Sequence, residues 1–248
     1  MTEICVSIVS HGQAQLVNHL LDDLHRVCHD VDVVVTSNIT ESEPLDFKLL
    51  SRGRYIENRT RKGFGANHNA AFRQCESPFF CVANPDIRIL SDPFPGLREA
   101  MNNPKVGLAV PLVLNPAGGV EDSVRRFPTP LGIVRKAAGM GDGRYVVEGA
   151  HSMPVDWAAG MFMFFRSEAF ADIQGFDENF FLYYEDVDIC ARLWKAGWQV
   201  VVVPMVSVVH AAQRSSRRNP HYLAWHLSSM AKYFTKHLGR LPRIGSDR

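Results

Sequence analysis

Short apolar runs alternate with stretches of helical periodicity in the first part of the chain. Residues 4–9 (ICVSIV) and 32–36 (DVVVT) have the β-branched composition of buried strands. Between them, apolar residues recur with helical spacing over residues 13–28. This β-α-β order predicts a right-handed Rossmann-like unit, in which ligands bind at the carboxyl ends of the strands.

Polar residues stand where these two strands end. Ser10-His11 follows the first strand and Ser37-Asn38 follows the second. Their side chains are able to hold a base or a ribose, and ordinary turn chemistry explains them equally well. The same patterns predict further strands at residues 79–83, 106–110 and 199–203, the last running on to His210, and helices over 66–75, 93–102 and 222–237.

The stretch from Trp157 to Arg192 organises the rest of the chain. A turn of small residues opens it, an apolar run follows, and an aromatic segment at residues 180–184 leads into Glu185-Asp186-Val187-Asp188. The spacing after these acids is helical, so the carboxylates lie at the start of a helix. Acids there often only offset the helix dipole. Four preceding aromatic residues favour a second interpretation, a general base at the edge of a pocket.

Two other segments carry polar residues that suit a nucleotide. Around Gly63 and Gly65, basic residues precede the start of a helix whose free N–H groups would cradle a diphosphate. A tight turn is the alternative there. Asn84-Pro85-Asp86 ends a predicted strand, where a carboxylate suits a divalent cation, although an Asx-Pro turn has equal weight. His210 also closes an apolar strand and would complete a metal site with Asp86.

Composition limits the class of protein. The chain has 248 residues, 46% hydrophobic and 21% charged, with a formal net charge of +1, so nothing favours a nucleic-acid partner. Five scattered cysteines without a C-x-x-C pair predict reduced, mostly buried thiols. No leader peptide or membrane-spanning run is evident. We therefore expect a cytoplasmic protein.

Two segments remain open to interpretation. Residues 115–149 are rich in Gly, Pro and Arg and predict a long loop that carries substrate contacts. Residues 214–248 hold eight Arg or Lys against one acid, Asp247. The helix expected there either packs on the domain or makes peripheral contact with the inner face of the cell membrane.

Four blocks of sequence together resemble a known enzyme family. They are the opening strand with His11, the loop from Asn58 to Asn69, Asn84-Pro85-Asp86, and the stretch from Trp157 to Arg192. The chain is similar in these blocks to family 2 inverting glycosyltransferases, and among them to rhamnosyltransferase-like members that act on bacterial surface polysaccharides. The likeness covers roughly residues 4–212.

The resemblance implies an α/β protein with the GT-A fold. A Rossmann-like N-terminal nucleotide-binding half (residues 1–112) would be fused to an acceptor-binding, catalytic half (113–212) around one central mixed, mostly parallel sheet. A basic helical extension (213–248) would follow. The donor would be a dTDP- or UDP-linked sugar, with dTDP-rhamnose favoured, and the acceptor a saccharide or lipid-linked saccharide.

The resemblance also implies roles for individual residues. Asp186 would be the general base, and Asp86 with His210 would bind Mn²⁺ or Mg²⁺. Tyr184, Glu185 and Arg126 would contact the acceptor. The nucleotide-sugar would lie against Ser10, His11, Ser37, Asn58, Gly63, Gly65, Asn67, Asn84, Asp86, Trp157 and Gly160.

Two positions depart from the family pattern. Asn84 replaces the first acid of the Asp-x-Asp metal motif, which lowers the local negative charge. Ser37 stands where an aspartate commonly reads the pyrimidine. These departures leave a non-catalytic sugar-nucleotide or polysaccharide-binding module as one alternative. A nucleotidyltransferase is another, although the short Ser10-His11-Gly12 turn lacks the activating loop of such enzymes.

Overall fold

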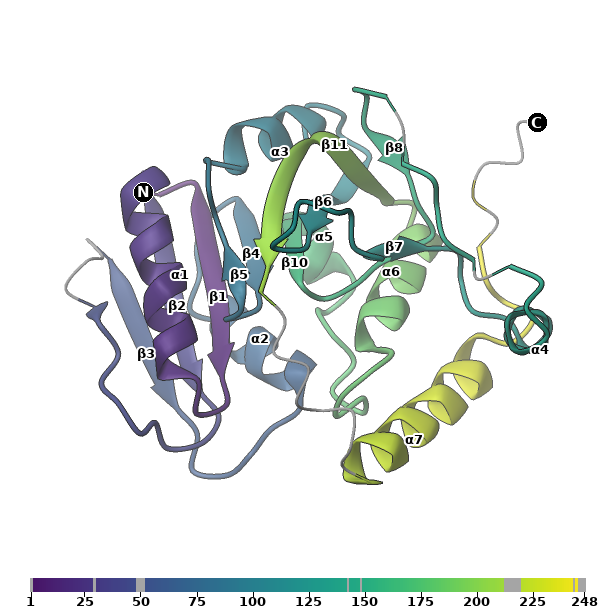
Figure 1. Ribbon diagram of the computed structural model, residues 1–248, viewed down its shortest axis with the longest axis horizontal. Helices are drawn as coiled ribbons and strands as arrows, with labels where there is room; N and C mark the ends of the chain where they lie inside the picture. The colour runs from purple at the N-terminus through teal and green to yellow at the C-terminus, as the bar shows by residue number, and fades with distance from the viewer. Residues whose placement is uncertain are drawn as a thin grey trace.

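The computed structural model describes residues 2–28, 30–47, 52–141, 143–147, 149–211, 220–242 and 244. Within them the central feature is one sheet with strand order β3-β2-β1-β4-β10-β6-β11-β5, and β8 pairs with β11 beyond this path. Figure 1 shows the sheet flanked by helices. The protein is therefore α/β, as the alternating pattern predicts.

The N-terminal strands form the expected Rossmann-like unit. Strands β1 (Ile4–Ser10), β2 (Val31–Ser37) and β3 (Gly53–Glu57) pair in parallel, with α1 (Ala14–Val27) between the first two. In this register Ser10 lies opposite Ser37, so both strands end at the same edge of the sheet. Strand β3 was not expected from the sequence, because its residues alternate between exposed and half-buried as in an edge strand.

The second half of the sheet is mixed. Strand β10 (Phe162–Arg166) runs antiparallel between β4 (Phe79–Ala83) and β6 (Val106–Leu114). Strand β11 (Gln199–His210) pairs in parallel with β6. The long ladders are thus parallel, with β10 inserted between them. Short strands complete the set: β5 (Ile87–Arg88), β8 (Met153–Pro154), and the separate pair β7 (Val124–Arg125) and β9 (Trp157–Ala158).

Both halves of the chain build this one sheet. Strand β10, from the predicted acceptor half, lies between two strands of the predicted nucleotide half. The boundary expected at residue 112 falls inside β6, and the division into halves stays a prediction.

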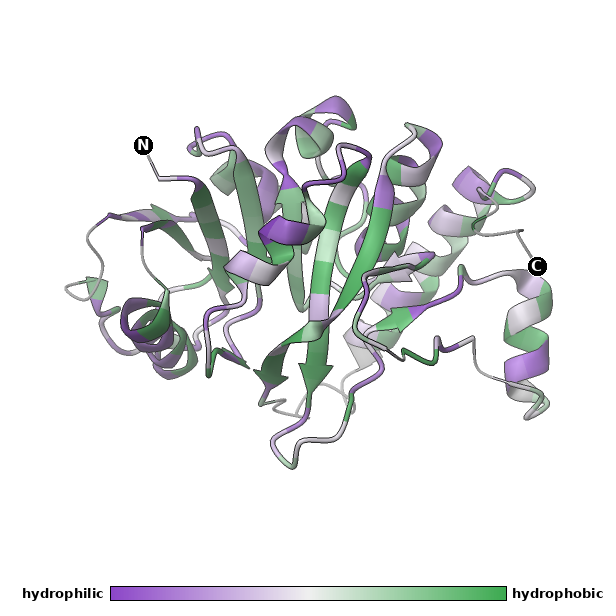
Figure 2. Ribbon diagram, turned by 90° about the horizontal axis from the view of Figure 1, so that it is seen from above, coloured by the Kyte–Doolittle hydropathy of each residue, from purple (hydrophilic) through white to green (hydrophobic). Residues whose placement is uncertain are grey.

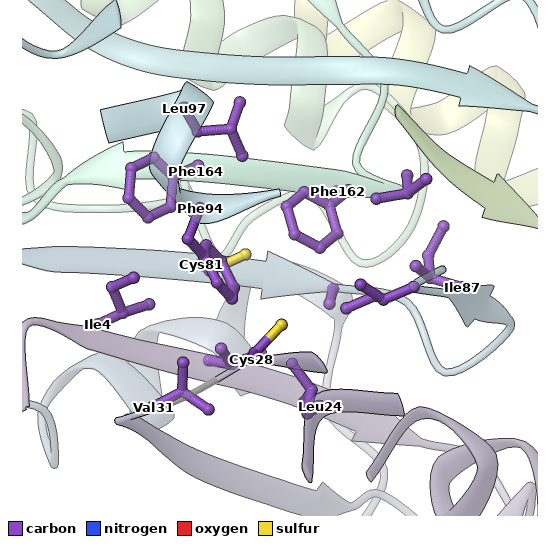
Figure 3. Packing of buried hydrophobic residues seen from close by; sticks show 14 of the residues in the cluster. Ile4, Leu24, Cys28, Val31, Cys81, Ile87, Phe94, Leu97, Phe162 and Phe164 are labelled. Atoms are coloured by element: carbon purple, nitrogen blue, oxygen red, sulfur yellow. The ribbon is translucent and has the colours of Figure 1, made fainter. Parts of the chain in front are cut away.

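Two hydrophobic clusters cover the two faces of the sheet. Helices α1 and α3 (Phe94–Ala100) pack on one face, in a cluster where Leu97 lies beside Phe164 and Leu24 lies on the side of Cys28 (Figure 3). Helices α2 (Phe64–Phe72), α5 (Ser167–Asp172), α6 (Glu185–Lys195) and α7 (Pro220–His237) contribute to the other. Figure 2 shows the strands as mostly hydrophobic bands between these layers. Burial on both faces explains why the strands read as continuous apolar runs.

Two sequence-based expectations are wrong. Cys5 and Cys75 form a disulfide, whereas the scattered cysteines predicted reduced thiols throughout. Their spacing of 70 residues gives no sign of pairing, because only the fold brings α2 and β1 together. In the segment expected to be a long loop, residues 130–137 form a helix, α4 (Pro130–Ala137). Thr129 caps it by accepting a hydrogen bond from the Gly132 N–H.

The glycine loop packs against the loop before the acidic helix. A Cβ at Gly65 would lie 2.5 Å from the Phe176 Cβ, and one at Gly63 would lie 2.8 Å from the Phe181 carbonyl oxygen. The Phe64 N–H donates a hydrogen bond of 2.9 Å to the same carbonyl. Glycine is therefore required here because two backbones approach closely.

We expect Gly65→Ala to destabilise the protein by about 1–3 kcal/mol, because the added methyl group overlaps the Phe176 side chain in a packed core. Urea unfolding of the full chain measures this difference. The matched control is Ala66→Ser, at a half-exposed position of the same helix. A Gly65→Ala protein as stable as the control would contradict the close packing of the two loops.

Candidate active site

Asp186 lies in the first turn of α6 with its carboxylate fixed by two backbone donors. Its Oδ1 accepts a hydrogen bond from the Val187 N–H at 2.8 Å, and its Oδ2 accepts one from the Gly160 N–H at 3.2 Å. A Cβ at Gly160 would lie 3.1 Å from the Phe64 ring and 3.8 Å from the Asp186 Cβ. The turn at residue 160 is therefore packed closely between α2 and α6. The acid is thereby held against the small-residue turn that precedes β10.

The electrostatic environment of Asp186 suits a base. Burial raises the pKa of Asp186 to about 6, and the hydrogen bonds from Val187 and Gly160 partly oppose that rise. The side chain nevertheless keeps some contact with solvent, so a proton can reach it. Neighbouring Glu185 is buried, and desolvation together with the charge of Asp186 raises its pKa well above the usual value. A carboxylate with a pKa near neutrality is well matched to accept a proton.

The backbone leading into α6 is strained. Tyr183 and Tyr184 have φ values of 70° and 65°, the left-handed region that β-carbons disfavour. Such residues cost about 1–3 kcal/mol each and persist only where their surroundings fix them. The strain ends directly before Glu185 and Asp186, so it sets the direction in which α6 starts.

Helix α7 fixes this strained loop from the other side. The Ser229 hydroxyl donates to the Leu182 carbonyl at 2.9 Å, and Lys232 donates to the Asn179 carbonyl. Tyr233 is fully buried and its ring packs 5.3 Å from that of Tyr184. The inner face of α7 therefore packs on the domain, which confirms one of the two interpretations of the basic C-terminal segment.

A buried charge network ties α7 to α6. Asp188 Oδ1 lies 2.7 Å from both His237 Nε2 and Lys236 Nζ, and its Oδ2 accepts from Arg192 at 2.7 Å. Burial opposes ionisation, but these three partners outweigh it and lower the pKa of Asp188 to about 2. Asp188 is therefore ionised at neutral pH and positions α7. Asp186, two residues earlier, remains the candidate general base.

A cleft of about 1060 Å³ opens beside Asp186. Glu185, Tyr184 and Trp157 line it together with the base candidate. The opposite wall is basic and contains Arg125, Arg126, Arg135, Lys136 and Arg144. The three residues predicted to contact an acceptor, Tyr184, Glu185 and Arg126, thus share one cleft with Asp186. Their acceptor role itself stays a prediction.

The predicted metal ligands also lie together. His210 Nε2 is 3.2 Å from Asp86 Oδ2, and His210 Nδ1 is 2.8 Å from Glu121 Oε2. The hydrogen bond to Asp86 raises the pKa of His210 to about 9, burial opposes it, and Glu121 adds to it. Asp86 Oδ1 is buried and has no hydrogen-bond partner. The imidazole Nε2 contacts the Oδ2 atom of the same carboxylate, so Asp86 and His210 place an unpaired oxygen and a ring nitrogen in one small region, where both could bind a cation.

Glu121 is a site residue that sequence reasoning missed. It lies in the segment expected to be a loop and carries no motif. Histidines that bind metals usually donate their second ring N–H to a carboxylate, which fixes the orientation of the ring. Glu121 stands in that relation to His210. Only a contact across 89 residues of sequence reveals it.

The turn before β10, residues 159–161, connects the candidate metal ligands with Asp186. The Asn84 N–H donates to the Met161 carbonyl at 2.9 Å, while the neighbouring Gly160 N–H donates to Asp186. The Ala159 N–H donates to the Ser123 carbonyl at 2.8 Å, two residues after Glu121. Asp86 and His210 do not line the cleft beside Asp186. The two groups are therefore linked through backbone hydrogen bonds of residues 159–161.

The residues predicted to bind the nucleotide form a hydrogen-bonded rim. Asn38 accepts from the Lys62 N–H and donates to the Lys62 carbonyl, both at 2.8 Å. Asn58 donates to Asn38 at 2.9 Å and to Asn67 at 2.6 Å. His11 lies 3.4 Å from Asn38. These amides hold the loop before α2 against the ends of β1 and β2.

Several of these side chains are buried more deeply than direct contact requires. Ser10, Ser37 and Asn67 are each 0% exposed, and the Ser37 hydroxyl donates to Glu41. In this structure they shape the rim from beneath, and Gly63 and Gly65 serve close packing. Their donor-binding role stays a prediction. Asn38, whose amide joins the two strand ends to the loop, is the structural centre of the rim.

Comparison with known proteins decides the family. The sequence model of the family described as glycosyl transferase family group 2 matches residues 86–233, more than half of the chain. The chain belongs to this family. It is a rhamnosyltransferase-like glycosyltransferase, which disfavours the nucleotidyltransferase alternative.

Two relatives show the closer likeness. Rhamnosyltransferase WbbL of Escherichia coli strain K12 is 28% identical over 94% of this chain and 93% of its own. An N-acetylglucosaminyl-diphospho-decaprenol L-rhamnosyltransferase of Mycobacterium tuberculosis is 32% identical over 73% of this chain. The match spans 63% of the mycobacterial enzyme, so that protein has further sequence without a counterpart in the match.

Solved structures confirm the GT-A fold. GalNAc-T7, crystallised with UDP, GalNAc and Mn²⁺, superposes with a TM-score of 0.71 at 14% identity over 95% of this chain and 48% of its own. A mannosyltransferase from Pyrobaculum calidifontis, in complex with GDP-Man and Mn²⁺, gives 0.64 at 16% identity over 97% and 66%. At such identities the likeness concerns the fold alone. No helix in the described parts of the chain is long and apolar enough to cross a membrane.

Proposed function

We propose that this chain transfers L-rhamnose from dTDP-L-rhamnose to a hydroxyl group of a saccharide or lipid-linked saccharide, with inversion at the anomeric carbon. The observation that carries the proposal is Asp186, a half-buried carboxylate with a raised pKa that lines the cleft and accepts a hydrogen bond from the turn before β10. The names of the two relatives support rhamnose as the sugar.

The chemistry requires a base and a stabilised leaving group. Asp186 accepts the proton of the acceptor hydroxyl while that oxygen attacks the anomeric carbon from the face opposite the diphosphate. The new glycosidic bond forms as the bond from sugar to phosphate breaks, and the nucleoside diphosphate leaves with the electron pair. Trp157, Tyr184 and Arg126 line the cleft where an acceptor would be held in line.

The residues at the end of β4 fit a divalent cation. Asp86 Oδ1 lacks a partner, and His210 presents Nε2 beside it with Glu121 behind. Within the described residues no three acidic, histidine or cysteine side chains converge on one point. Phosphate oxygens and water would complete the coordination, as Mg²⁺ and Mn²⁺ commonly require. When bound, Mn²⁺ or Mg²⁺ would neutralise charge that develops on the diphosphate.

Asn84 weakens this site in one respect. It supplies a neutral amide where the family's metal motif has an acid. We therefore propose that Asp86 and His210 are the main protein ligands of the metal ion. The affinity for the metal ion then depends on the negative charge of the bound nucleotide. Because His210 is protonated at neutral pH in the free protein, metal binding at Nε2 must displace a proton.

Thermal shift measurements identify the donor. We expect dTDP-L-rhamnose with Mn²⁺ to stabilise the full chain more than UDP- or GDP-linked sugars do. A ligand at a hundred times its Kd adds about 2.7 kcal/mol, which corresponds to a Tm rise of several degrees. The matched control, Asp86→Asn, should lose the part of the shift that requires Mn²⁺. Equal stabilisation by all bases, or by none, would contradict the donor assignment.

We expect Asp186→Asn to lower kcat about 10²–10⁴-fold while nucleotide affinity is retained, because the amide cannot accept the proton. Asp172→Asn is the matched control, since that carboxylate only accepts a hydrogen bond from Trp198. A raised pKa keeps Asp186 protonated below pH 6, so the wild-type rate should fall about tenfold per pH unit below that value.

Two results would remove Asp186 from this role. One is a variant with more than a tenth of the wild-type turnover. The other is a wild-type rate that stays constant between pH 5 and pH 7. A chain that binds the nucleotide-sugar but transfers nothing to any acceptor mixture would instead favour the alternative, a non-catalytic binding module.

We expect Glu121→Gln to weaken Mn²⁺ binding about 10–100-fold in the presence of saturating dTDP, because the imidazole loses the carboxylate that orients it. Electron paramagnetic resonance of free Mn²⁺ gives the dissociation constant without any assay of turnover. Glu99→Gln, an exposed change on α3, is the control. If Glu121→Gln binds Mn²⁺ as tightly as the control does, Glu121 does not support the metal ligand.

A further inference from the structure

Helix α4 is exposed in an unusual way. It has eight residues, and its apolar side chains face solvent: Leu131 is 64% exposed, Ile133 37% and Val134 63%. Met140, just beyond the helix, is 64% exposed. A helix this short is marginal in water without packing on an apolar face. The exposed apolar side chains of α4 and Met140 are therefore a candidate surface for a partner.

Helix α7 offers a similar surface on its outer side. Its inner face is occupied by the contacts to the loop before α6, but Leu223, Leu227 and Leu238 are 61%, 49% and 61% exposed. Leu223 and Leu227 are four residues apart and therefore lie on the same face of the helix. The two helices lie at the end of the molecule opposite β3 (Figure 1).

Both helices line the cleft that contains Asp186. Ile133 and Met140 belong to the α4 side of its lining, and His226 and Met230 belong to α7. The exposed apolar residues therefore flank the opening of the candidate acceptor cleft. A partner that covers them would lie directly at its mouth.

The charges on α4 and α7 indicate what kind of partner would cover their exposed apolar residues. Residues 130–141 contain Arg135 and Lys136 and no acid. Residues 220–242 contain no acid either, and of their bases Lys232 and Lys236 bond to the domain while Arg240 is exposed. A second copy of the chain would bring bases against bases across a symmetric contact. An anionic lipid surface instead matches both the apolar and the basic side chains. Arg214, Arg217, Arg218, Arg243 and Arg248 lie outside the described residues.

We propose that α4 and the outer face of α7 seat the protein on an anionic lipid bilayer, with the cleft opening toward the membrane. The apolar side chains of α4 enter the boundary between headgroups and acyl chains, and Arg135 and Lys136 contact the headgroups. The sequence pattern pointed only to α7, whereas the structure assigns the main contact to α4. This membrane contact does not depend on sugar transfer.

Co-sedimentation of the full chain with vesicles tests the proposal without donor or acceptor. The vesicles are pure phosphatidylcholine or phosphatidylcholine mixed with phosphatidylglycerol. We expect binding to the mixed vesicles only, and weaker binding as salt is raised. The double variant Leu131→Ser/Val134→Ser should bind at least about tenfold more weakly, because it removes two apolar side chains that the membrane would bury. Arg135→Ala/Lys136→Ala should lose about fivefold for each base.

Matched controls remove the same chemistry elsewhere. Leu90→Ser/Met205→Ser alters two side chains that are 69% and 73% exposed, and Arg73→Ala/Lys105→Ala removes two exposed bases. Both controls should bind like the wild type, and all variants should melt at similar temperatures. Wild-type protein that remains in the supernatant, equal binding to neutral vesicles, or controls that lose as much binding as the α4 variants would each overturn the proposal.

Discussion

The close contact between the start of α2 and the loop at residues 176–181 is the constraint on which the site depends. Gly63 and Gly65 allow two backbones to meet, and the Phe64 N–H then bonds the Phe181 carbonyl. One side of this contact leads to the rim of Asn38 and Asn58. The other leads to Asp186. The contact therefore fixes the position of the rim relative to Asp186, and with it the position of a nucleotide under the proposed function.

Helix α7 makes that arrangement rigid. Two consecutive tyrosines in the left-handed region would relax if the loop were free, and the ring of Tyr233 together with the Ser229 hydroxyl prevents it. Asp188 shows how neighbouring carboxylates take different roles. It has three cationic or imidazole partners and a low pKa, whereas Asp186 has only backbone donors and a raised one. Environment, more than residue type, separates the positioning acid from the candidate base.

Much of the fold could be predicted because its strands are buried on both faces and read as apolar runs. Strand β4 matches its predicted range at both ends, and α1 matches within one residue. Strand β3 was not predicted from the sequence, because an edge strand has no continuous apolar run. Helix α4 was not predicted, because its short segment lies in a Gly- and Pro-rich region and its apolar residues stay largely exposed. The Cys5–Cys75 pair could not be foreseen, since cysteine spacing carries no information about contacts across 70 residues.

The site also contains residues that the sequence predicts and residues that only the structure reveals. Asp86, His210 and Asp186 were predicted from motifs. The structure brings the first two into contact and joins the third to the turn at residues 159–161 through the Gly160 N–H. Glu121 belongs to no motif, so only its distance to His210 reveals it. Asn38 was noted as a polar residue after a strand, but its bonds to the loop at Lys62 appear only in the structure. Ser10 and Ser37 at strand ends and Asn67 on α2 are fully buried, a feature that the sequence pattern did not indicate, and their donor-binding role stays a prediction.

The central claim is that a metal-bound donor lies between Asp86 and Asp186. A crystal structure of the Asp186→Asn variant with Mn²⁺ and dTDP-L-rhamnose, with the metal located by anomalous scattering, tests it most directly. We expect Mn²⁺ at about 2.0–2.3 Å from Asp86 and His210, with the anomeric carbon turned toward residue 186. A nucleotide bound on another face, or a metal coordinated away from Asp86 and His210, would contradict it.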